Sequence, residues 1–288
     1  MTTKSTIKNR SLTFRIFAAF AIVITALTGS SFLVQHYPVF DNNPTYNHVI
    51  TACLIAIITV LGVGILRSRV DKGTPTKIGL GNPSTAFKHV SIGIGLILIP
   101  LVLTLIISSV FNWADFSFNT NKTILLTFAM GLISTLFTDA LTEELIFRGY
   151  IYSNLKVHYS VWKSSLIPLV IFVITPLVIF SIQNMLNLQG AVPLSGGYIV
   201  TMLLFGAFMQ YLRVQYKSIW VGVGFHLVFV HMNQLMGTSS DKLLQFSETS
   251  NQQLVQITLS IFLIIAFLML LIYPIVKRRR IKSQQGKV

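Results

Sequence analysis

The stretch Thr142–Arg148 holds the densest group of ionisable side chains in the apolar part of the sequence. It reads Thr-Glu-Glu-Leu-Ile-Phe-Arg and follows an apolar run that begins near Thr123. The whole chain has 8 acidic residues, and three of them, Asp139, Glu143 and Glu144, fall within six positions here. Carboxylates inside a membrane segment are unfavourable unless they are paired, neutralised or hydrated, so they usually mark function. We therefore expect the chemistry of this protein at this stretch.

The residue types indicate hydrolysis. A carboxylate held beside an imidazole in a low-dielectric cavity can act as a general base, and histidine or asparagine can donate a hydrogen bond to a developing oxyanion. A glutamate that activates water would hydrolyse a peptide bond without a covalent intermediate. Other strongly polar side chains inside apolar runs are Gln183, Asn184, His226, His231 and Asn233.

Each of these residues also has a purely structural interpretation. Arg148 lies one helical turn after Glu144, so the two can form an ion pair that only ties helices together. Adjacent glutamates project about 100° apart on a helix, so the two glutamates do not face one cavity equally. His226 and Asn184 can serve as hydrogen-bonding groups between helices, and His231, five residues after His226, projects elsewhere.

The composition places these residues in a membrane protein. The chain of 288 residues is 53% hydrophobic and 10% charged, whereas soluble domains carry about 25% charged residues. A net charge of +14 raises the question of nucleic acid, but the basic residues gather at the ends of apolar runs, as the insertion rule predicts. We therefore expect membrane lipids and no nucleic acid as partners. The lone Cys53 excludes an intramolecular disulfide.

Eight apolar runs predict an all-α bundle of eight transmembrane helices. The fourth run has about 33 residues, or about 50 Å of helix, which exceeds the hydrocarbon core of about 30 Å, so this helix must tilt or emerge. Pro176 should kink the fifth. The runs are Ile16–Val34, His48–Leu66, Val90–Phe111, Thr123–Leu155, Ser164–Leu188, Tyr198–Leu212, Ile219–Met236 and Leu254–Ile275.

The distribution of basic residues predicts that both termini are cytoplasmic. The first apolar run is longer than the apolar region of a signal peptide, so we interpret it as a retained span. The chain divides into three spans in 1–122, a core of four spans in 123–236, and the last span with a basic tail in 237–288. The segments expected inside, all basic, are 1–15, 67–88, 156–163, 213–217 and 277–288.

Two motifs resemble a known family. Glu143-Glu144-Leu145-Ile146-Phe147-Arg148-Gly149 is similar to the first signature, Glu-Glu-x-x-x-Arg, of the CPBP family, which comprises type II CAAX prenyl endopeptidases and the Abi proteins of bacteriocin processing and self-immunity. Downstream, Trp220 precedes His226 by six positions, as in the last signature of that family. The resemblance covers about residues 123–236.

The resemblance implies a fold and a mechanism. The family fold is an eight-helix membrane bundle with a cavity open to the cytosol. By similarity, Glu143 would activate water, Glu144 and Arg148 would support the site, and His226 would orient the water or polarise the scissile carbonyl. The family is described as glutamic, so no cofactor is expected and a metal is possible but not required; three metal ligands are not evident in the sequence.

The chain departs from the family pattern at two positions. The middle signature is Phe-x-x-x-His, but no histidine lies between His158 and His226. One alignment begins at Phe180 and places Asn184 at the histidine position, and we prefer it because asparagine can donate a hydrogen bond. A gap-free alignment begins at Phe172 and places Pro176 there. Where the last signature has asparagine or another polar residue four positions after the histidine, this chain has Val230.

Three functions follow as hypotheses. The first is an intramembrane endopeptidase that cleaves a membrane-associated peptide or protein at the cytoplasmic side, with Glu143, Glu144, Arg148, His226 and Asn184 as its site. The second is a catalytically inactive scaffold or regulator of a cell-envelope or surface-protein process, with an envelope enzyme as its partner. The third, a transporter with a carboxylate proton relay, ranks last because no inverted repeat is visible. The composition suggests a bacterial plasma membrane.

Overall fold

The computed structural model describes most of the chain, in two compact units. The first unit, which contains the candidate site, comprises Met1–Gly93 and Leu126–His231, and the second comprises Ile94–Leu125 and Met232–Val288. The described residues are 2–37, 44–71, 77–188, 195–239, 241–247, 249–251, 253–265, 267–268 and 270. The basic tail expected at 277–288 lies outside them.

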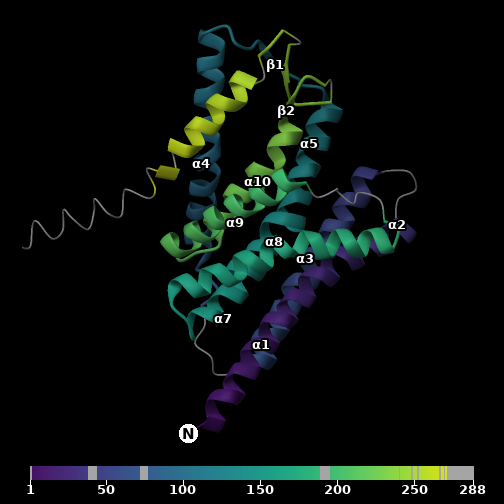
Figure 1. Ribbon diagram of the computed structural model, residues 1–288. Helices are drawn as coiled ribbons and strands as arrows, with labels where there is room; N and C mark the ends of the chain where they lie inside the picture. The colour runs from purple at the N-terminus through teal and green to yellow at the C-terminus, as the bar shows by residue number, and fades with distance from the viewer. Residues whose placement is uncertain are drawn as a thin grey trace, which may run out of the picture. The chain divides into compact units, whose positions relative to one another are not determined.

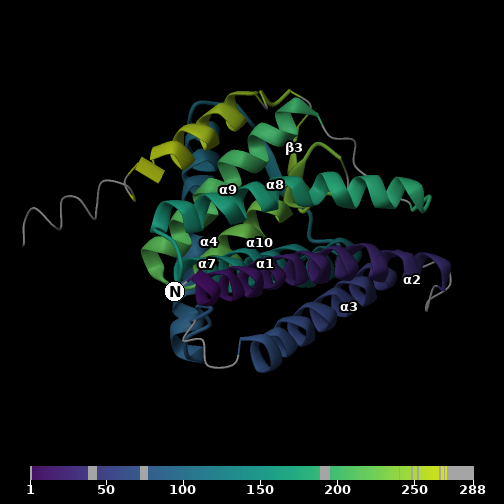
Figure 2. The same cartoon turned by 60° about the horizontal axis from the view of Figure 1, so that its bottom comes forward.

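Helices form nearly all of the first unit. α1 and α3 pack against each other, and Figures 1 and 2 show them running together. Several helices contain π-helical segments, labelled η, in which the chain is wound more loosely than in an α-helix. The elements are α1 (Thr2–Ile24), η1 (Thr25–Gly29), α2 (Ser30–His36), α3 (Pro44–Ile65), η2 (Leu66–Val70), α4 (Pro83–Val110), α5 (Lys122–Thr135), η3 (Leu136–Ala140), α6 (Leu141–Glu143), η4 (Glu144–Ile151), α7 (Tyr152–Lys156), α8 (Val161–Met185), α9 (Gly196–Tyr216) and α10 (Trp220–Leu235).

Six described helices are long and apolar enough to cross a membrane, so the protein is a helical multi-pass membrane protein. They match the first six expected runs closely, because each run is a long uninterrupted apolar stretch. The seventh and eighth runs correspond to shorter apolar helices, Trp220–Met232 and Gln253–Ile265. The count of eight spans and the cytoplasmic location of the termini therefore stay predictions. The six are Leu12–His36, Thr45–Val70, Pro83–Val110, Lys122–Lys156, Val161–Met185 and Gly196–Tyr216.

Local sequence signals set where the helices of the first unit begin and end. The Asn82 side chain accepts the Thr85 amide at 2.8 Å, just ahead of Pro83, which is a favoured residue in the first turn. Ser195 caps α9 in the same way by accepting the Tyr198 amide at 3.1 Å. Lys217 ends α9 in a left-handed conformation, with φ of 54°. These signals mark the start of α4 and both ends of α9.

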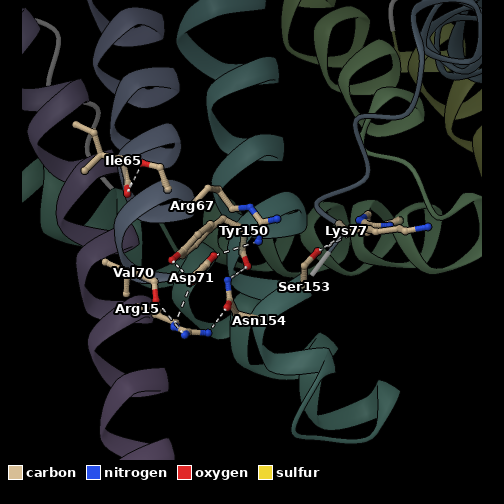
Figure 3. A network of polar contacts seen from close by, with 11 residues as sticks. Arg15, Ile65, Arg67, Val70, Asp71, Lys77, Tyr150, Ser153 and Asn154 are labelled. Carbon is tan, nitrogen blue, oxygen red and sulfur yellow. Dashed lines mark hydrogen bonds and ion pairs between the residues drawn. The ribbon is translucent and has the colours of Figure 1, made fainter. Parts of the chain in front are cut away.

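A buried polar network joins the interior of α1 to the ends of η2 and η4 and to α7 (Tyr152–Lys156) (Figure 3). Asp71 stands at its centre, with a side chain only 1% exposed; Arg15 Nε lies 3.2 Å from one of its oxygens and Arg67 Nη1 3.2 Å from the other. The Tyr150 hydroxyl donates to Asp71 at 3.1 Å, and Arg15 donates to the Asn154 side chain at 3.0 Å. We call Arg15, Arg67, Asp71, Tyr150 and Asn154 the Asp71 network; it holds in place the helix that carries the candidate site.

The second unit contains a small sheet that the all-α prediction lacked. β1 (Phe116–Phe118) pairs antiparallel with β3 (Leu244–Phe246), Phe116 opposite Phe246, and β2 (Met236–Gly237) pairs parallel with β3, in the order β1-β3-β2. Leu244 and Phe246 are buried in a cluster with Ala114 and Val255. Strands of two or three residues are too short to show a period in the sequence, which explains why this sheet was missed.

Candidate functional site

Glu143, Glu144 and Arg148 lie on one continuous helical segment of the first unit. From α5 to α7 the chain stays helical, but η3 and η4, which flank Glu143, are wound as π-helix. Such segments often occur at functional sites. All eight residues of η4 are buried, and α1, α3, α8 and α9 all contact it. A helix buried on all sides holds its side chains at fixed positions.

Glu144 and Arg148 form the ion pair that their spacing predicts. Arg148 Nη1 lies 3.1 Å from Glu144 Oε1, and both side chains are 1% exposed. Arg148 Nη2 also donates to the main-chain carbonyl of Gly206 at 3.3 Å, and the guanidinium carbon stands 4.3 Å from the centre of the Phe172 ring. A charge this deeply buried is tolerated only when it is paired in this way.

His226 stands between the two glutamates. Its Nε2 is 3.8 Å from Glu143 Oε2, and its Nδ1 is 3.6 Å from Glu144 Oε1. Both distances exceed that of a hydrogen bond, and catalytic hydrogen bonds are often long before substrate binds. The Phe205 ring packs edge-on against the imidazole with centroids 4.8 Å apart.

The two glutamates differ in exposure, as their angular separation on a helix predicts. The Glu143 side chain is 20% exposed and that of Glu144 is 1% exposed. The side chain of Glu143 is therefore partly exposed, whereas that of Glu144 is enclosed by Arg148 and His226. The exposed carboxylate and the enclosed one are suited to different roles.

Gly222 on α10 makes room for the enclosed carboxylate. A Cβ at this position would collide with Glu144 Oε2 and come within 2.9 Å of its Cδ. A Cβ at Gly93, in the interior of α4, would likewise collide with the main chain of Val221 and Phe225. α10 can therefore bring His226 to the glutamates only because two glycines leave the space open.

Asp139 and Tyr198 also interact with the cluster that Glu143, Glu144 and His226 form. Asp139, four positions before Glu143, interacts electrostatically with Glu143 and with His226. Tyr198 on α9 interacts with both Asp139 and Glu143. Tyr198 lies seven positions before Phe205, so the two share one face of α9. Asp139 is evident from the sequence as a carboxylate near the two glutamates. Tyr198 is not, because a tyrosine at the start of an apolar run does not by itself indicate a functional site.

The structure does not bring Asn184 to this cluster. Asn184 is exposed on α8, whereas the α8 residue that contacts Arg148 is Phe172. Twelve residues separate the two, or about 18 Å of helix. The geometry thus favours the gap-free alignment, in which Pro176 takes the histidine position one turn after Phe172. Both prolines of α8 lie within one continuous helix.

The remaining polar candidates lie elsewhere or outside the described side chains. His231 is buried, with 2% exposure, and its ring packs against Phe128 with centroids 4.7 Å apart, three turns before Asp139 on the same continuous helix. The Asn233 side chain is not among those described. Within the described residues, no three His, Cys, Asp or Glu side chains stand close enough to hold a metal ion.

Comparison with known proteins agrees with the two motifs. Residues 125–232 match the family model described as Type II CAAX prenyl endopeptidase Rce1-like, and no curated protein matches the sequence significantly. The matched segment runs from α5 to α10 and includes the Glu144–Arg148 pair and His226. The match agrees with the resemblance to the CPBP family that the motifs indicate, and residues 125–232 are similar to its Rce1-like members.

Proposed function

We propose that the protein is an intramembrane endopeptidase of the glutamic type that hydrolyses a peptide bond in a membrane-associated peptide or protein. One observation carries this proposal: a partly exposed glutamate, Glu143, stands beside His226, while Glu144 is enclosed in an ion pair with Arg148. A carboxylate accessible to water next to an imidazole is the arrangement that general-base hydrolysis requires.

The chemistry then proceeds in two steps. Glu143 takes a proton from water as the oxygen attacks the scissile carbonyl carbon, which gives a tetrahedral intermediate with a negatively charged oxygen. His226 donates a hydrogen bond to that oxygen. Glu143 returns its proton to the amide nitrogen as the carbon–nitrogen bond breaks, which leaves a carboxylic acid and an amine. Arg148 pairs with Glu144, and Glu144 contacts the far side of the imidazole through Nδ1.

Asp139 and Tyr198 are proposed to serve in place of the histidine absent from α8. Both interact with the Glu143 carboxylate, and the tyrosine hydroxyl is a donor that can stabilise an oxyanion. Asn184 stays a candidate from the sequence alone, and its distance along α8 from Phe172 argues against it.

The cytoplasmic side is the proposed side of cleavage. The cluster lies on the segment that ends at Lys156, and the same end of the unit carries Arg15, Arg67 and Arg213. Basic ends of spans face the cytoplasm under the insertion rule. We propose a bacterial plasma membrane as the location, with a membrane-bound peptide, such as a bacteriocin precursor, as the class of substrate.

The test is cleavage of a broad peptide library by the purified protein in detergent, followed by mass spectrometry. Glu143→Gln should abolish cleavage and His226→Ala should lower it about 10²–10³-fold, the usual loss for one oxyanion donor, whereas Asn184→Ala should change it less than about twofold. Asp241→Asn, at a carboxylate 69% exposed, is the control. Cleavage that survives in Glu143→Gln would contradict the glutamic mechanism.

A second candidate is a catalytically inactive scaffold or regulator of a cell-envelope process. It is favoured by one specific observation: Pro176 and Val230 stand where the family has polar groups. For a scaffold we expect no cleavage by the wild-type protein, together with a cellular phenotype that is unchanged in Glu143→Gln. Capture of an envelope protein that still binds Glu143→Gln would support this function.

A further inference from the structure

Arg213, near the end of α9, is buried rather than facing the membrane surface. Its exposure is 6%. Its Nε donates to the Arg148 carbonyl at 2.8 Å, and its Nη2 donates to the Lys77 carbonyl at 3.2 Å and to the Ser153 hydroxyl at 3.3 Å. Among the described residues, no carboxylate lies within ion-pair distance of it. Neutral acceptors therefore surround a buried charge, which needs their hydrogen bonds.

The bond to Arg148 has a counterpart in the opposite direction. The Arg148 side chain donates to the Gly206 carbonyl on α9, while the Arg213 side chain on α9 donates to the Arg148 carbonyl. Gly206 and Arg213 are seven positions apart, so they lie on one face of α9, about two turns from each other. Two arginines thus join α9 to η4 at two levels, and Arg148 is held by both its main chain and its side chain.

The loop before α4 is shaped around the same guanidinium. Gly79 has a φ of +86°, and a Cβ there would come within 2.9 Å of Arg213 Cζ. The Gly79 carbonyl accepts the Ile219 amide at 3.1 Å, and the Leu80 carbonyl accepts the Trp220 indole. Arg213 is therefore enclosed by α7, α9, η4 and this loop, and the loop in turn fixes the start of the helix that carries His226.

We propose that Arg213 is a positioning residue for the candidate site. Its hydrogen bond to the Arg148 carbonyl fixes the position of the Glu144–Arg148 pair along α9. It thereby fixes the position of both glutamates relative to His226. Its consequence for catalysis rests on the proposed function, but its effect on η4 does not. A misplacement of about 1 Å at a catalytic group can lower a rate about 10²-fold, so a loose η4 should affect turnover more than substrate binding.

The test replaces Arg213 by lysine in the full-length protein in detergent. Lysine keeps the charge, but a single ammonium group cannot reproduce the planar fork that reaches three acceptors. Arg69→Lys makes the same chemical change at an exposed arginine of η2 that belongs neither to the site nor to the Asp71 network, and it serves as the control. The readouts are amide hydrogen exchange of each helix and, separately, the kcat and KM of peptide cleavage.

We expect Arg213→Lys to raise exchange at least about tenfold within Glu144–Ile151 while α3 stays protected, and to lower kcat about 10–100-fold with KM within about threefold. Arg69→Lys should leave both kcat and η4 exchange unchanged. The proposal would be overturned if η4 of Arg213→Lys exchanged its amide hydrogens at the wild-type rate. It would also be overturned if the exchange rate rose equally in every helix. If wild-type protein cleaves nothing, the proposed function fails, and hydrogen exchange still decides the role of Arg213.

A milder variant covers the case in which Arg213→Lys does not fold. Ser153→Ala removes one acceptor of the same guanidinium and leaves its bond to Arg148. Its exchange in η4 should rise by about two- to fivefold, with kcat lowered by a similar factor. Exchange and kcat both equal to the wild-type values in Ser153→Ala, together with an unfolded Arg213→Lys, would overturn the proposal, because Arg213 would then act on stability alone.

Discussion

At the scale of single residues, the site depends on a glycine, which has no Cβ, as much as on its charged side chains. Glu144 can be enclosed by Arg148 and His226 only because Gly222 contributes no Cβ on that side. Its neighbour Glu143 is left as the partly exposed carboxylate of the two. Two identical, adjacent residues thus acquire different environments from the helices packed against them.

Gly222→Ala should displace Glu144 and disrupt the site. The added methyl group would collide with the carboxylate, and overpacking of this kind lowers stability by about 1–3 kcal/mol. Cleavage should fall at least about tenfold. Thermal unfolding in detergent and the peptide assay measure the two effects. Gly64→Ala is the matched control, since a Cβ at Gly64 meets nothing within 4 Å; equal stability of the two variants would contradict the collision.

At the scale of helices and their connections, hydrogen bonds and ion pairs between sequence-distant segments hold the site helix. The Asp71 network ties it to α1 and η2, and Arg213 ties it to α9. From the sequence alone, Arg15, Arg67 and Arg213 indicate only which side of the membrane is cytoplasmic. These arginines can direct the orientation of the chain during insertion and also stabilise the fold, because a basic side chain at the end of a span can point into the protein.

Asp71→Asn should destabilise the fold. It would leave the Arg15 and Arg67 guanidinium groups without their counter-ion, and breaking a buried pair costs about 3–5 kcal/mol. Arg67 keeps 30% exposure, so we expect about 2–3 kcal/mol, measured as a lower free energy of unfolding in detergent. Asp241→Asn removes an exposed carboxylate and should change stability by less than about 0.5 kcal/mol. A loss of equal size in both variants would exclude a special role of the network.

How far the sequence predicts the structure differs from element to element. The bounds of the first six spans follow from long apolar runs, and the Glu144–Arg148 pair follows from a spacing of four on a helix. The meeting of His226 with both glutamates was inferred from family resemblance, because the approach of α10 depends on Gly222 and Gly93. The role of Asn184 stays a prediction: it is exposed on α8, 12 positions after Phe172, and sequence matching does not measure the rise along a helix.

At the scale of the whole molecule, the orientation in the membrane decides which compartment supplies the substrate. The predicted cytoplasmic side rests on the basic segments 67–88, 156–163 and 213–217. The residues expected on the opposite side include Lys122 and Asp241, which are both exposed. Exposed residues on each predicted side allow a direct test.

Single cysteines should report that orientation. In a Cys53→Ala background, which removes the only cysteine of the sequence, Lys163→Cys should resist a membrane-impermeant maleimide in intact cells and react after permeabilisation. Asp241→Cys should react without permeabilisation. The degree of labelling is read by mass shift. The reverse pattern would place the basic segments outside and would move the proposed cleavage to the other face of the membrane.

The Glu144–Arg148 pair also bears on how the chain is synthesised. Its two partners lie one turn apart on the same helix, so the pair can form before α8, α9 and α10 have left the ribosome. A segment that carries its own counter-ion enters the lipid with one positive and one negative charge already neutralised, which lowers the cost of inserting it. Without Arg148, Glu144 would stay unpaired in the bilayer until the later helices are inserted. The pair can therefore support biogenesis of the protein before it supports any chemistry.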